Sequence, residues 1–348
     1  MAVPVDESTA APDDAPASAS ASGEPLWLRL LRRWGTIAVI VLTGVGFSFA
    51  TPYFLTFSNF NNILFSMIVP CLVSIGLTYV VIAGSFDLSV GLCVTTTSIV
   101  CAFLIPLVGP WPAIVLSLLA ATLIGSVNGV LVTYGRLSGI VVTLGMMFVL
   151  GGINIYLTGG YQVAVDYTEK AFRYIGQGRF QLSDDRSMAI AVPVVILAVI
   201  FLLHLAVAGK TRVGYYIRAV GDNAMAAFYS GIPVYRWVIV AFVLSSLTAG
   251  IGGVLLTSIS SSAQPVGGEG YLLGAFAAVF LGATVLGKGK PHVLGTLLGV
   301  FFIYMVNSGM NMVGFPYAAR QLFAGAILIL AVGANALLNR EEIHLKFI

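Results

Sequence analysis

Residues 60–108 read FNNILFSMIVPCLVSIGLTYVVIAGSFDLSVGLCVTTTSIVCAFLIPLV and contain one charged side chain, Asp87. An apolar run lies on each side of Asp87, and each run is close to the roughly 20 residues that a helix needs to cross a bilayer. Because backbone groups in lipid must be paired within their own segment, apolar runs of this length form helices. The stretch therefore predicts two transmembrane helices, 60–83 and 88–108, joined by a short turn.

The same pattern continues in both directions from this stretch. Turn-forming dipeptides such as Thr51-Pro52, Gly109-Pro110 and Gly159-Gly160 separate further apolar runs. We predict an all-α polytopic membrane protein with about ten transmembrane helices. These spans are expected over residues 34–51, 60–83, 88–108, 111–132, 139–158, 188–208, 237–257, 271–287, 292–313 and 318–338.

The composition agrees with a membrane protein and excludes other classes. Of the 348 residues, 58% are hydrophobic and only 9% are charged, whereas a soluble domain carries about 25% charged residues. A soluble protein could not cover so much apolar surface with so few charges. The net charge is only +3 and the basic residues are scattered, so we expect membrane lipid around the chain and no nucleic-acid partner. Cys71, Cys93 and Cys101 all lie in apolar runs, which predicts packing roles.

The basic residues indicate the orientation. If the N-terminus is cytoplasmic, 12 of the 17 Lys and Arg residues lie on the cytoplasmic side, so both termini are expected there. Residues 1–28, rich in Ala, Ser, Pro and acids, are expected to form a disordered cytoplasmic tail. The transmembrane domain then covers 29–343, with a cytoplasmic end at 344–348. It has two large connections, an external loop over 159–187 and a cytoplasmic loop over 209–236.

A weak internal repeat relates the two halves of the chain. Residues 74–91 read SIGLTYVVIAGSFDLSVG and residues 250–267 read GIGGVLLTSISSSAQPVG, and an Asn in a small-residue stretch follows in each half, at Asn128 and Asn307. The repeats, spans 2–5 and 7–10, are five spans apart. Because five is odd, the halves would be inserted in opposite senses, an arrangement that many transporters use.

No pattern in the chain indicates catalysis or a bound cofactor. Residues 282–288, GATVLGK, approach a phosphate-loop motif, but Gly289 stands where Ser or Thr is required. The segment also ends a predicted span, whereas the phosphate loop follows a strand of a soluble sheet. We therefore expect no catalytic residue, no metal and no cofactor in this chain, and ATP, if it is used, is bound by a partner subunit.

A few polar residues lie within apolar runs, where burial in hydrocarbon costs several kcal/mol unless the polar group is hydrogen-bonded or hydrated. Candidates for a polar solute path are Asp87, Asn128, Gln264, Glu269 and Asn307. For Asp87 two interpretations stay open. It caps the helix that follows, where the helix dipole favours an acid, or it belongs to a turn at membrane depth that lines the path.

The cytoplasmic loop 209–236 contains a predicted short helix over 222–229. Asp222 or Asn223 can cap this helix, and Gly231 can end it before Pro233. Its small apolar side chains suit insertion into a groove of a partner. The alternative is an amphipathic loop on the lipid headgroups.

Four segments carry a recognisable combination of motifs. They are GSFDLSVG at 84–91, NG followed by VTLGM within 128–146, AVGDN followed by SGI within 219–232, and LGAT followed by LGT within 281–296. Together, and in this order across residues 35–338, they resemble elements of the membrane permeases of ribose-type sugar ABC importers. Ser85 and Phe86 depart from the Gly and Ile of that pattern. Family members serve pentoses, hexoses, polyols and a furanose-like signalling molecule, so the solute stays open.

The resemblance implies a permease subunit that forms the translocation path for a monosaccharide or a related small polyhydroxylated solute. ATP hydrolysis would take place on a separate cytoplasmic ABC ATPase, and a periplasmic binding protein would deliver the solute. A second permease copy or a paralogue would complete the transporter in the bacterial inner membrane. Residues expected to contact the ATPase are Ala219, Gly221, Asp222, Asn223, Ala226, Ala227, Ser230 and Gly231.

Two further expectations follow. The external loop 159–187 has mixed charges that suit a transient polar interface with the binding protein. A secondary carrier or facilitator for a small polar solute is the alternative function, and it would need no ATPase.

Overall fold

The computed structural model describes residues 26–165, 170–181, 189–286 and 289–338. Most of the predicted tail 1–28 and the whole predicted end 344–348 lie outside the described residues. The helices are α1 (Leu26–Ala50), α2 (Phe57–Ser66), α3 (Ile68–Ile82), α4 (Val90–Val108), α5 (Pro110–Thr133), α6 (Gly139–Thr158), α7 (Lys170–Gln177), α8 (Val192–Lys210), α9 (Arg212–Asp222), α10 (Ala224–Tyr229), α11 (Val234–Ser260), α12 (Tyr271–Leu286), α13 (Val293–Met312) and α14 (Tyr317–Leu338).

Each predicted span overlaps a helix, with one difference. The predicted span 60–83 is two helices, α2 and α3, that meet at Met67 with a bend of 49°. Pro70 lies in the first turn of α3, and a proline cannot donate the backbone hydrogen bond that would continue the helix from the preceding turn. The break therefore has a local cause in the sequence.

The apolar helices fit a polytopic membrane protein. Within the described residues, six helices are long and apolar enough to cross a membrane, namely α4, α5, α6, α8, α11 and α13, and the bent pair α2–α3 would make a seventh. Large apolar side chains on α5 and α6 are exposed, among them Leu119 and Phe148. In water such a surface would be unfavourable, whereas lipid covers it.

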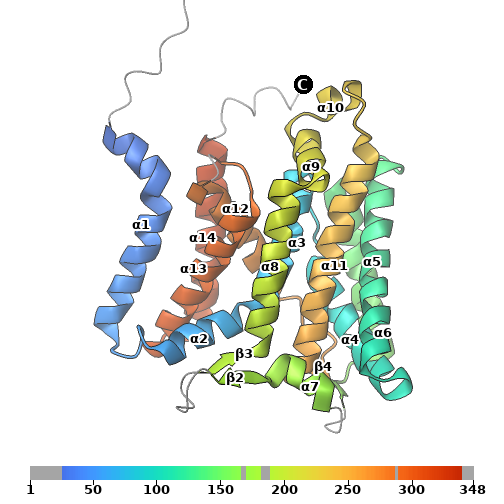
Figure 1. Ribbon diagram of the computed structural model, residues 1–348, viewed down its shortest axis with the longest axis horizontal. Helices are drawn as coiled ribbons and strands as arrows, with labels where there is room; N and C mark the ends of the chain where they lie inside the picture. The colour runs from blue at the N-terminus through green and yellow to red at the C-terminus, as the bar shows by residue number, and fades with distance from the viewer. Residues whose placement is uncertain (1–25, 166–169, 182–188, 287–288, 339–348) are drawn as a thin grey trace, which may run out of the picture.

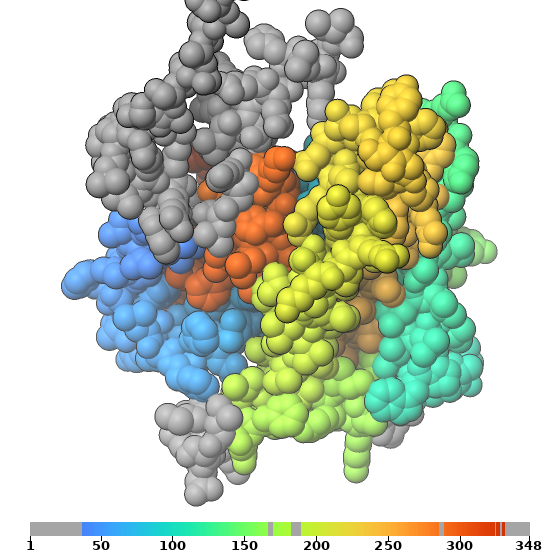
Figure 2. Space-filling model, turned by 45° about the horizontal axis from the view of Figure 1, so that its top comes forward, coloured from blue at the N-terminus to red at the C-terminus, as the bar shows by residue number. Residues whose placement is uncertain are grey.

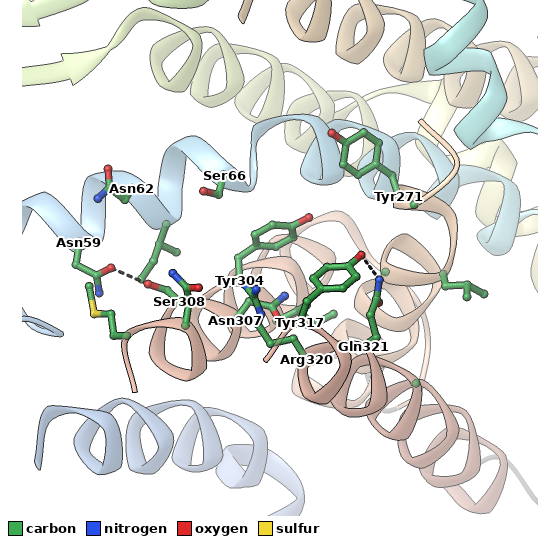
Figure 3. A pocket seen from close by; sticks show the side chains of 18 of the residues that line it. Asn59, Asn62, Ser66, Tyr271, Tyr304, Asn307, Ser308, Tyr317, Arg320 and Gln321 are labelled. Carbon is green, nitrogen blue, oxygen red and sulfur yellow. Dashed lines mark hydrogen bonds between the residues drawn. The ribbon is translucent and has the colours of Figure 1, made fainter. Parts of the chain in front are cut away.

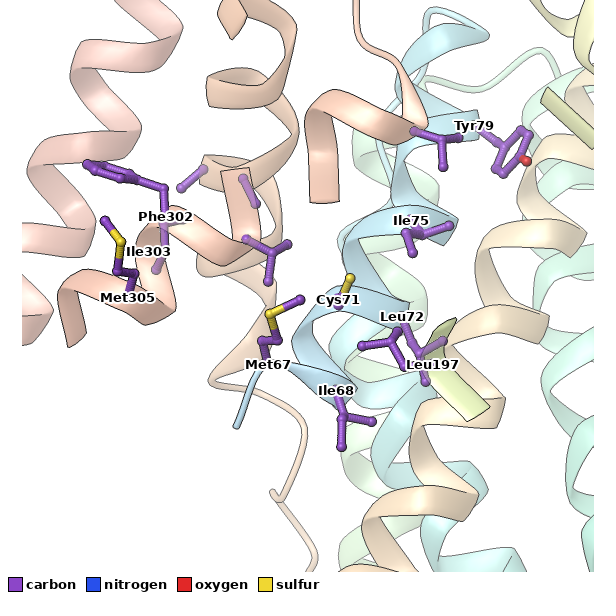
Figure 4. Packing of buried hydrophobic residues seen from close by; sticks show 14 of the residues in the cluster. Met67, Ile68, Cys71, Leu72, Ile75, Tyr79, Leu197, Phe302, Ile303 and Met305 are labelled. Atoms are coloured by element: carbon purple, nitrogen blue, oxygen red, sulfur yellow. The ribbon is translucent and has the colours of Figure 1, made fainter. Parts of the chain in front are cut away.

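α3 lies at the centre of the bundle. Every residue from Ile68 to Val80 is buried, as expected for a helix that is apolar all round. Figure 4 shows its side chains, including Leu72 and Ile75, beside Leu197 of α8 and near Phe302 and Ile303 of α13. α11 packs along α3, α4 and α5, so α3 and α11 form the inner pair of helices.

The packing partners repeat between the two halves. α4 packs on α5 and α6, as α12 packs on α13 and α14. α3 contacts α12 and α13, and α11 contacts α4 and α5 in the same way. At the crossing of the halves, a β-carbon on Gly91 would meet the carbonyl oxygen of Gly268, and one on Gly268 would meet that of Gly91. These glycines occupy nearly corresponding positions of the sequence repeat, so the packing follows it.

The two ends of the bundle carry different elements (Figure 1). One end carries α7 and two short antiparallel strand pairs: β1 (Val163–Ala164) pairs with β4 (Ser262–Ala263), and β2 (Arg179–Gln181) pairs with β3 (Ala189–Ala191). The opposite end carries α9 and α10, and the start of α1 and the end of α14 lie at this same end.

Candidate functional site

The turn between α3 and α4 is held by Asp87, whose side chain is fully buried. Its Oδ1 accepts hydrogen bonds from the backbone N–H of Ser89 at 3.0 Å and from the Ser89 hydroxyl at 2.6 Å. Its Oδ2 accepts one from the hydroxyl of Ser245 on α11, at 3.1 Å. Both carboxylate oxygens are therefore occupied within the protein.

Two neighbouring helices complete this turn. Asn128 on α5 donates to the Ser89 hydroxyl at 2.9 Å, and the Thr143 hydroxyl on α6 accepts from the backbone N–H of Leu88 at 2.9 Å. Asn128 and Thr143 lie about one helical turn inside the ends of α5 and α6, so the non-helical backbone lies roughly 7 Å inside the bundle. Such backbone is tolerated at membrane depth only where protein groups satisfy it. The family-like segments 84–91 and 128–146 thus meet at one buried turn.

Ser89 occupies the N-cap position of α4 without a side-chain capping bond, and Asp87, two residues before it, accepts the Ser89 N–H. Asp87 closes the turn that precedes α4, and it is not among the residues that line the cavity between α2, α12, α13 and α14. The Oδ1 of Asn128 is buried without a hydrogen-bond partner in the described part of the chain. In this conformation the pair supports the turn, and contact with a solute stays a prediction.

A cavity of about 660 Å³ lies between α2, α12, α13 and α14. More of its lining surface is apolar than polar, but most of the residues that line it are polar, and we call it the polar cavity. Figure 3 shows its side chains converging from these helices. Polar residues of the lining are Asn59, Asn62, Ser66, Glu269, Tyr271, Tyr304, Asn307, Ser308, Asn311, Tyr317, Arg320 and Gln321. Amides and hydroxyls, which both donate and accept hydrogen bonds, dominate this set, and it contains one acid and one base.

Some lining groups are engaged with one another. The Ser308 hydroxyl donates to Asn59 Oδ1 at 2.7 Å, Gln321 donates to the hydroxyl of Tyr317, and the Arg320 guanidinium lies 5.5 Å from the centre of the Tyr317 ring.

Other lining groups remain available to a ligand. Within the described residues, the side-chain amides of Asn62, Asn307 and Asn311 have no hydrogen-bond partner. A small solute with several hydroxyls could bond to these amides.

The structure separates the five predicted path residues into three places. Glu269 and Asn307 line the cavity. Asp87 and Asn128 lie in the buried turn, and Gln264 is exposed and does not line the cavity. The sequence analysis predicted none of the lining on α2 and α14. On α13, the spacing of Asn307 and Asn311, four residues apart and on one helical face, is a signal that could have located the cavity wall.

The buried turn and the cavity are physically connected. Gly91, in the first turn of α4, contacts Gly268 backbone to backbone. The backbone N–H of Gly268 donates to the Thr95 hydroxyl at 2.8 Å, and Glu269 of the cavity follows directly. A movement of the α3–α4 turn would therefore reach the cavity wall through the start of α4.

The short helix predicted over 222–229 is present as α10 over 224–229, and Asn223, one of its two candidate caps, caps it. The Asn223 side chain accepts from the backbone N–H of Ala226 at 2.9 Å. Gly231 has a φ of +78°, which suits glycine and ends the helix. Ala227 is buried, whereas Ala226 is exposed together with Met225, Phe228 and Tyr229. α10 therefore presents an apolar face outward.

The residues just before α10 contact two other parts of the bundle. A β-carbon on Gly221 would overlap the carbonyl oxygen of Ile82 at the end of α3, so only glycine permits this approach. Asp222 forms an ion pair with Lys290 in the α12–α13 connection, with 2.7 Å between Asp222 Oδ1 and Lys290 Nζ. α9 and α10 are thus anchored next to the α3–α4 turn.

Residues 159–187, predicted to form an external loop, are anchored where the structure describes them. The backbone of α7 packs closely on the end of α11, where the Ser258 hydroxyl donates to the carbonyl of Phe172 at 2.5 Å and Gln177 donates to the Ser261 hydroxyl at 3.0 Å. Arg186 of this loop lies outside the described residues. Among the described residues there is also no cluster of His, Cys, Asp or Glu that could hold a metal ion.

Known proteins match almost the whole chain. A family model described as branched-chain amino acid transport system, permease component, matches residues 59–332. The ribose import permease protein of Escherichia coli strain K12 is 34% identical over 306 residues, which cover 87% of this chain and 93% of that protein. The L-arabinose ABC transporter permease protein of Azospirillum brasilense is 33% identical over 325 residues, 92% of each chain. The autoinducer 2 import system permease protein of Yersinia enterocolitica is 30% identical over 331 residues, 91% and 97% of the two chains. No solved structure matches the chain.

Proposed function

The chain belongs to the family of branched-chain amino acid transport system permease components, and from this membership we propose that it forms the solute path of an ATP-driven importer. Permeases of this kind are not enzymes, and ATP is hydrolysed on separate subunits. The solute we propose is a monosaccharide or a related small polyhydroxylated molecule, since the relatives named above are permeases for ribose, L-arabinose and autoinducer 2.

The observation that carries this proposal is the chemistry of the polar cavity. Sugar hydroxyls donate and accept hydrogen bonds, as do the amides of Asn62, Asn307 and Asn311 that face the cavity. The charges of Glu269 and Arg320 balance, which suits a neutral solute. The same pair could hold the ammonium and carboxylate of an amino acid, so the test below includes one.

We propose that about ten helices cross the membrane and that both termini lie in the cytoplasm. The repeated packing of α3–α6 and α11–α14 supports two halves inserted in opposite senses. The start of α1, the end of α14, and α10 all lie at one end of the bundle (Figure 1), which fits a shared cytoplasmic side. The membrane would be the bacterial inner membrane.

Permeases of ABC importers work with an ATPase and a periplasmic binding protein. We propose that residues 219–233 dock into the ATPase, with Ala226 on the exposed face of α10, and that Gly221 transmits its movement to the α3–α4 turn. The external loop 159–187 would receive the binding protein. A second permease, either another copy of this chain or a paralogue, would complete the transporter.

The test is uptake into proteoliposomes that contain the permease, its ATPase and the binding protein. Radiolabelled pentoses, hexoses, polyols and leucine are compared with and without ATP. We expect ATP-dependent accumulation of one polyhydroxylated solute and none of leucine. Accumulation of leucine would contradict the solute class. Uptake at the full rate by the permease alone, without ATP, would establish the alternative of a secondary carrier or facilitator.

A further inference from the structure

A second hollow lies at the end of the bundle that carries α9 and α10. It has a volume of about 610 Å³ and is bordered by the first turns of α9 and α11 and by the segment that joins α10 to α11. Figure 2 views this end of the molecule, with α9 and α10 in yellow. The solute path proposed above does not use this hollow.

Two arginines border the hollow, and neither has an acidic partner in the part of the chain that the structure describes. Arg212 begins α9 and Arg236 lies in the first turn of α11. In the described part of the chain, neither arginine has an ion-pair or hydrogen-bond partner. Arg236 instead lies over the ring of Trp237, 5.7 Å from its centre. Among the described residues, therefore, no acidic side chain compensates the two positive charges of the hollow.

The rest of the lining also favours an anion. Neither α9 nor α11 has a side-chain hydrogen bond capping its N-terminus, and the free N–H groups of a helix start attract negative charge. The Nε1 of Trp237 is buried without a partner in the described chain, so one more donor is unused. No acidic side chain lines the hollow.

Aromatic side chains place the hollow at a membrane surface. The Tyr216 ring meets the Tyr215 ring edge-on at 5.6 Å and lies tilted against the Trp237 ring at 4.9 Å. Tyr and Trp favour the depth of the lipid headgroups. Gly214, Ile217 and Val220 bury one face of α9 against the bundle, which leaves Arg212 and Tyr215 exposed. α9 thus lies on the bundle with a basic and aromatic outer face.

We propose that this hollow binds the phosphate of an anionic phospholipid headgroup from the cytoplasmic leaflet. Arg212 and Arg236 bond to the phosphate oxygens, as guanidinium groups do with paired hydrogen bonds, and the Tyr215, Tyr216 and Trp237 rings pack on the glycerol region. Because the hollow joins the end of α10 to the start of α11, a bound headgroup would hold the ATPase-facing helix in place. The assignment to the cytoplasmic leaflet rests on the proposed insertion.

The test measures lipid binding to the full chain in detergent, by thermal unfolding and native mass spectrometry. The probes are phosphatidylglycerol, phosphatidylcholine and inorganic phosphate. We expect selective binding of phosphatidylglycerol. Arg212→Gln should weaken its affinity about five-fold, and Arg212→Gln combined with Arg236→Gln about 25-fold, because each arginine near an anionic lipid contributes a similar binding free energy. The control, Arg136→Gln with Lys210→Gln, removes two exposed cations outside the hollow and should bind like the unmodified chain.

Three outcomes would overturn the proposal. If the Arg212/Arg236 variant and the Arg136/Lys210 control bind phosphatidylglycerol equally well, the hollow is not the lipid-binding site. Saturation by inorganic phosphate at the same affinity would assign it to a soluble anion. Loss of ATPase copurification in the Arg212/Arg236 variant, with its lipid binding unchanged, would assign the hollow to the ATPase. Because binding is measured on the isolated chain, a negative result leaves the transport proposal standing, and failed uptake leaves the lipid result standing.

Discussion

At the scale of single residues, Asp87 has a structural role in the α3–α4 turn and a predicted role in transport, and two substitutions distinguish these roles. Asp87→Ala leaves the N–H and hydroxyl of Ser89 and the hydroxyl of Ser245 without their acceptor. A buried group left unpaired costs about 1–3 kcal/mol. Asp87→Asn keeps one acceptor oxygen and can donate to Ser245.

We therefore expect a clear loss of thermal stability in detergent for Asp87→Ala and a small loss for Asp87→Asn. If Asp87 only supports the turn, Asp87→Asn also retains uptake. A folded Asp87→Asn variant without uptake would instead show that the carboxylate itself is needed on the path. Equal melting temperatures for Asp87→Ala and the unmodified chain would contradict the structural account.

For Gly221 we make a specific prediction about the coupling of ATP hydrolysis to uptake. Because a β-carbon there would overlap the Ile82 carbonyl, Gly221→Ala must push α9 away from α3. We expect ATP hydrolysis to continue with uptake strongly reduced, measured together in proteoliposomes. Gly209→Ala is the matched control, since a β-carbon at Gly209 meets no atom within 4 Å. Normal coupled uptake by Gly221→Ala would mean that this contact does not transmit movement.

At the scale of elements, α10 is the helix whose role depends on a partner. Ala226 is exposed on α10, beside exposed Met225 and Phe228, so Ala226→Trp should leave the bundle folded and block docking of the ATPase. The measurement is copurification of the ATPase, with Leu137→Trp, at an exposed position between α5 and α6, as the bulky control. Equal recovery of the ATPase with both variants would remove α10 from the interface.

The elements also show how far sequence reasoning reaches. Apolar runs and turn residues predicted the long apolar helices, but not α7 or α9, which lie in segments expected to be loops. Asn223 was one of two predicted caps of α10, because capping depends on local sequence. The break at Met67 was not predicted, although Pro70 was visible. Periodicity could not show which face of α14 is inward, because the helix is apolar around most of its circumference.

The site was harder to predict than the fold for a physical reason. Asp87 and Ser245 are 158 positions apart in the chain, and nothing local links them. The cavity likewise joins α2 to three helices of the other half. A polar residue in an apolar run marks a position where burial costs free energy. The sequence alone does not show whether that position is a buried turn, as for Asn128, or a cavity wall, as for Asn307.

At the scale of the whole molecule, the cavity, the α3–α4 turn and α10 form one continuous line of contacts. Gly221 contacts the end of α3, the turn leads into α4, and Gly91 contacts Gly268 beside the cavity residue Glu269. A repeated bundle with α3 and α11 at its centre can rock about this line, which is how inverted-repeat transporters are thought to alternate access. ATP hydrolysis on a partner could thus change the exposure of the cavity.

The central claim, that the solute passes through the polar cavity, is tested by labelling single cysteines. Asn307→Cys and Asn311→Cys are made in a chain whose native Cys71, Cys93 and Cys101, all buried, are replaced. A water-soluble thiol reagent should label both positions, the transported solute should protect them, and Leu119→Cys on the exposed face of α5 should stay unlabelled. Absence of labelling at 307 and 311 in every nucleotide state, or labelling that saturating solute leaves unchanged, would contradict the account.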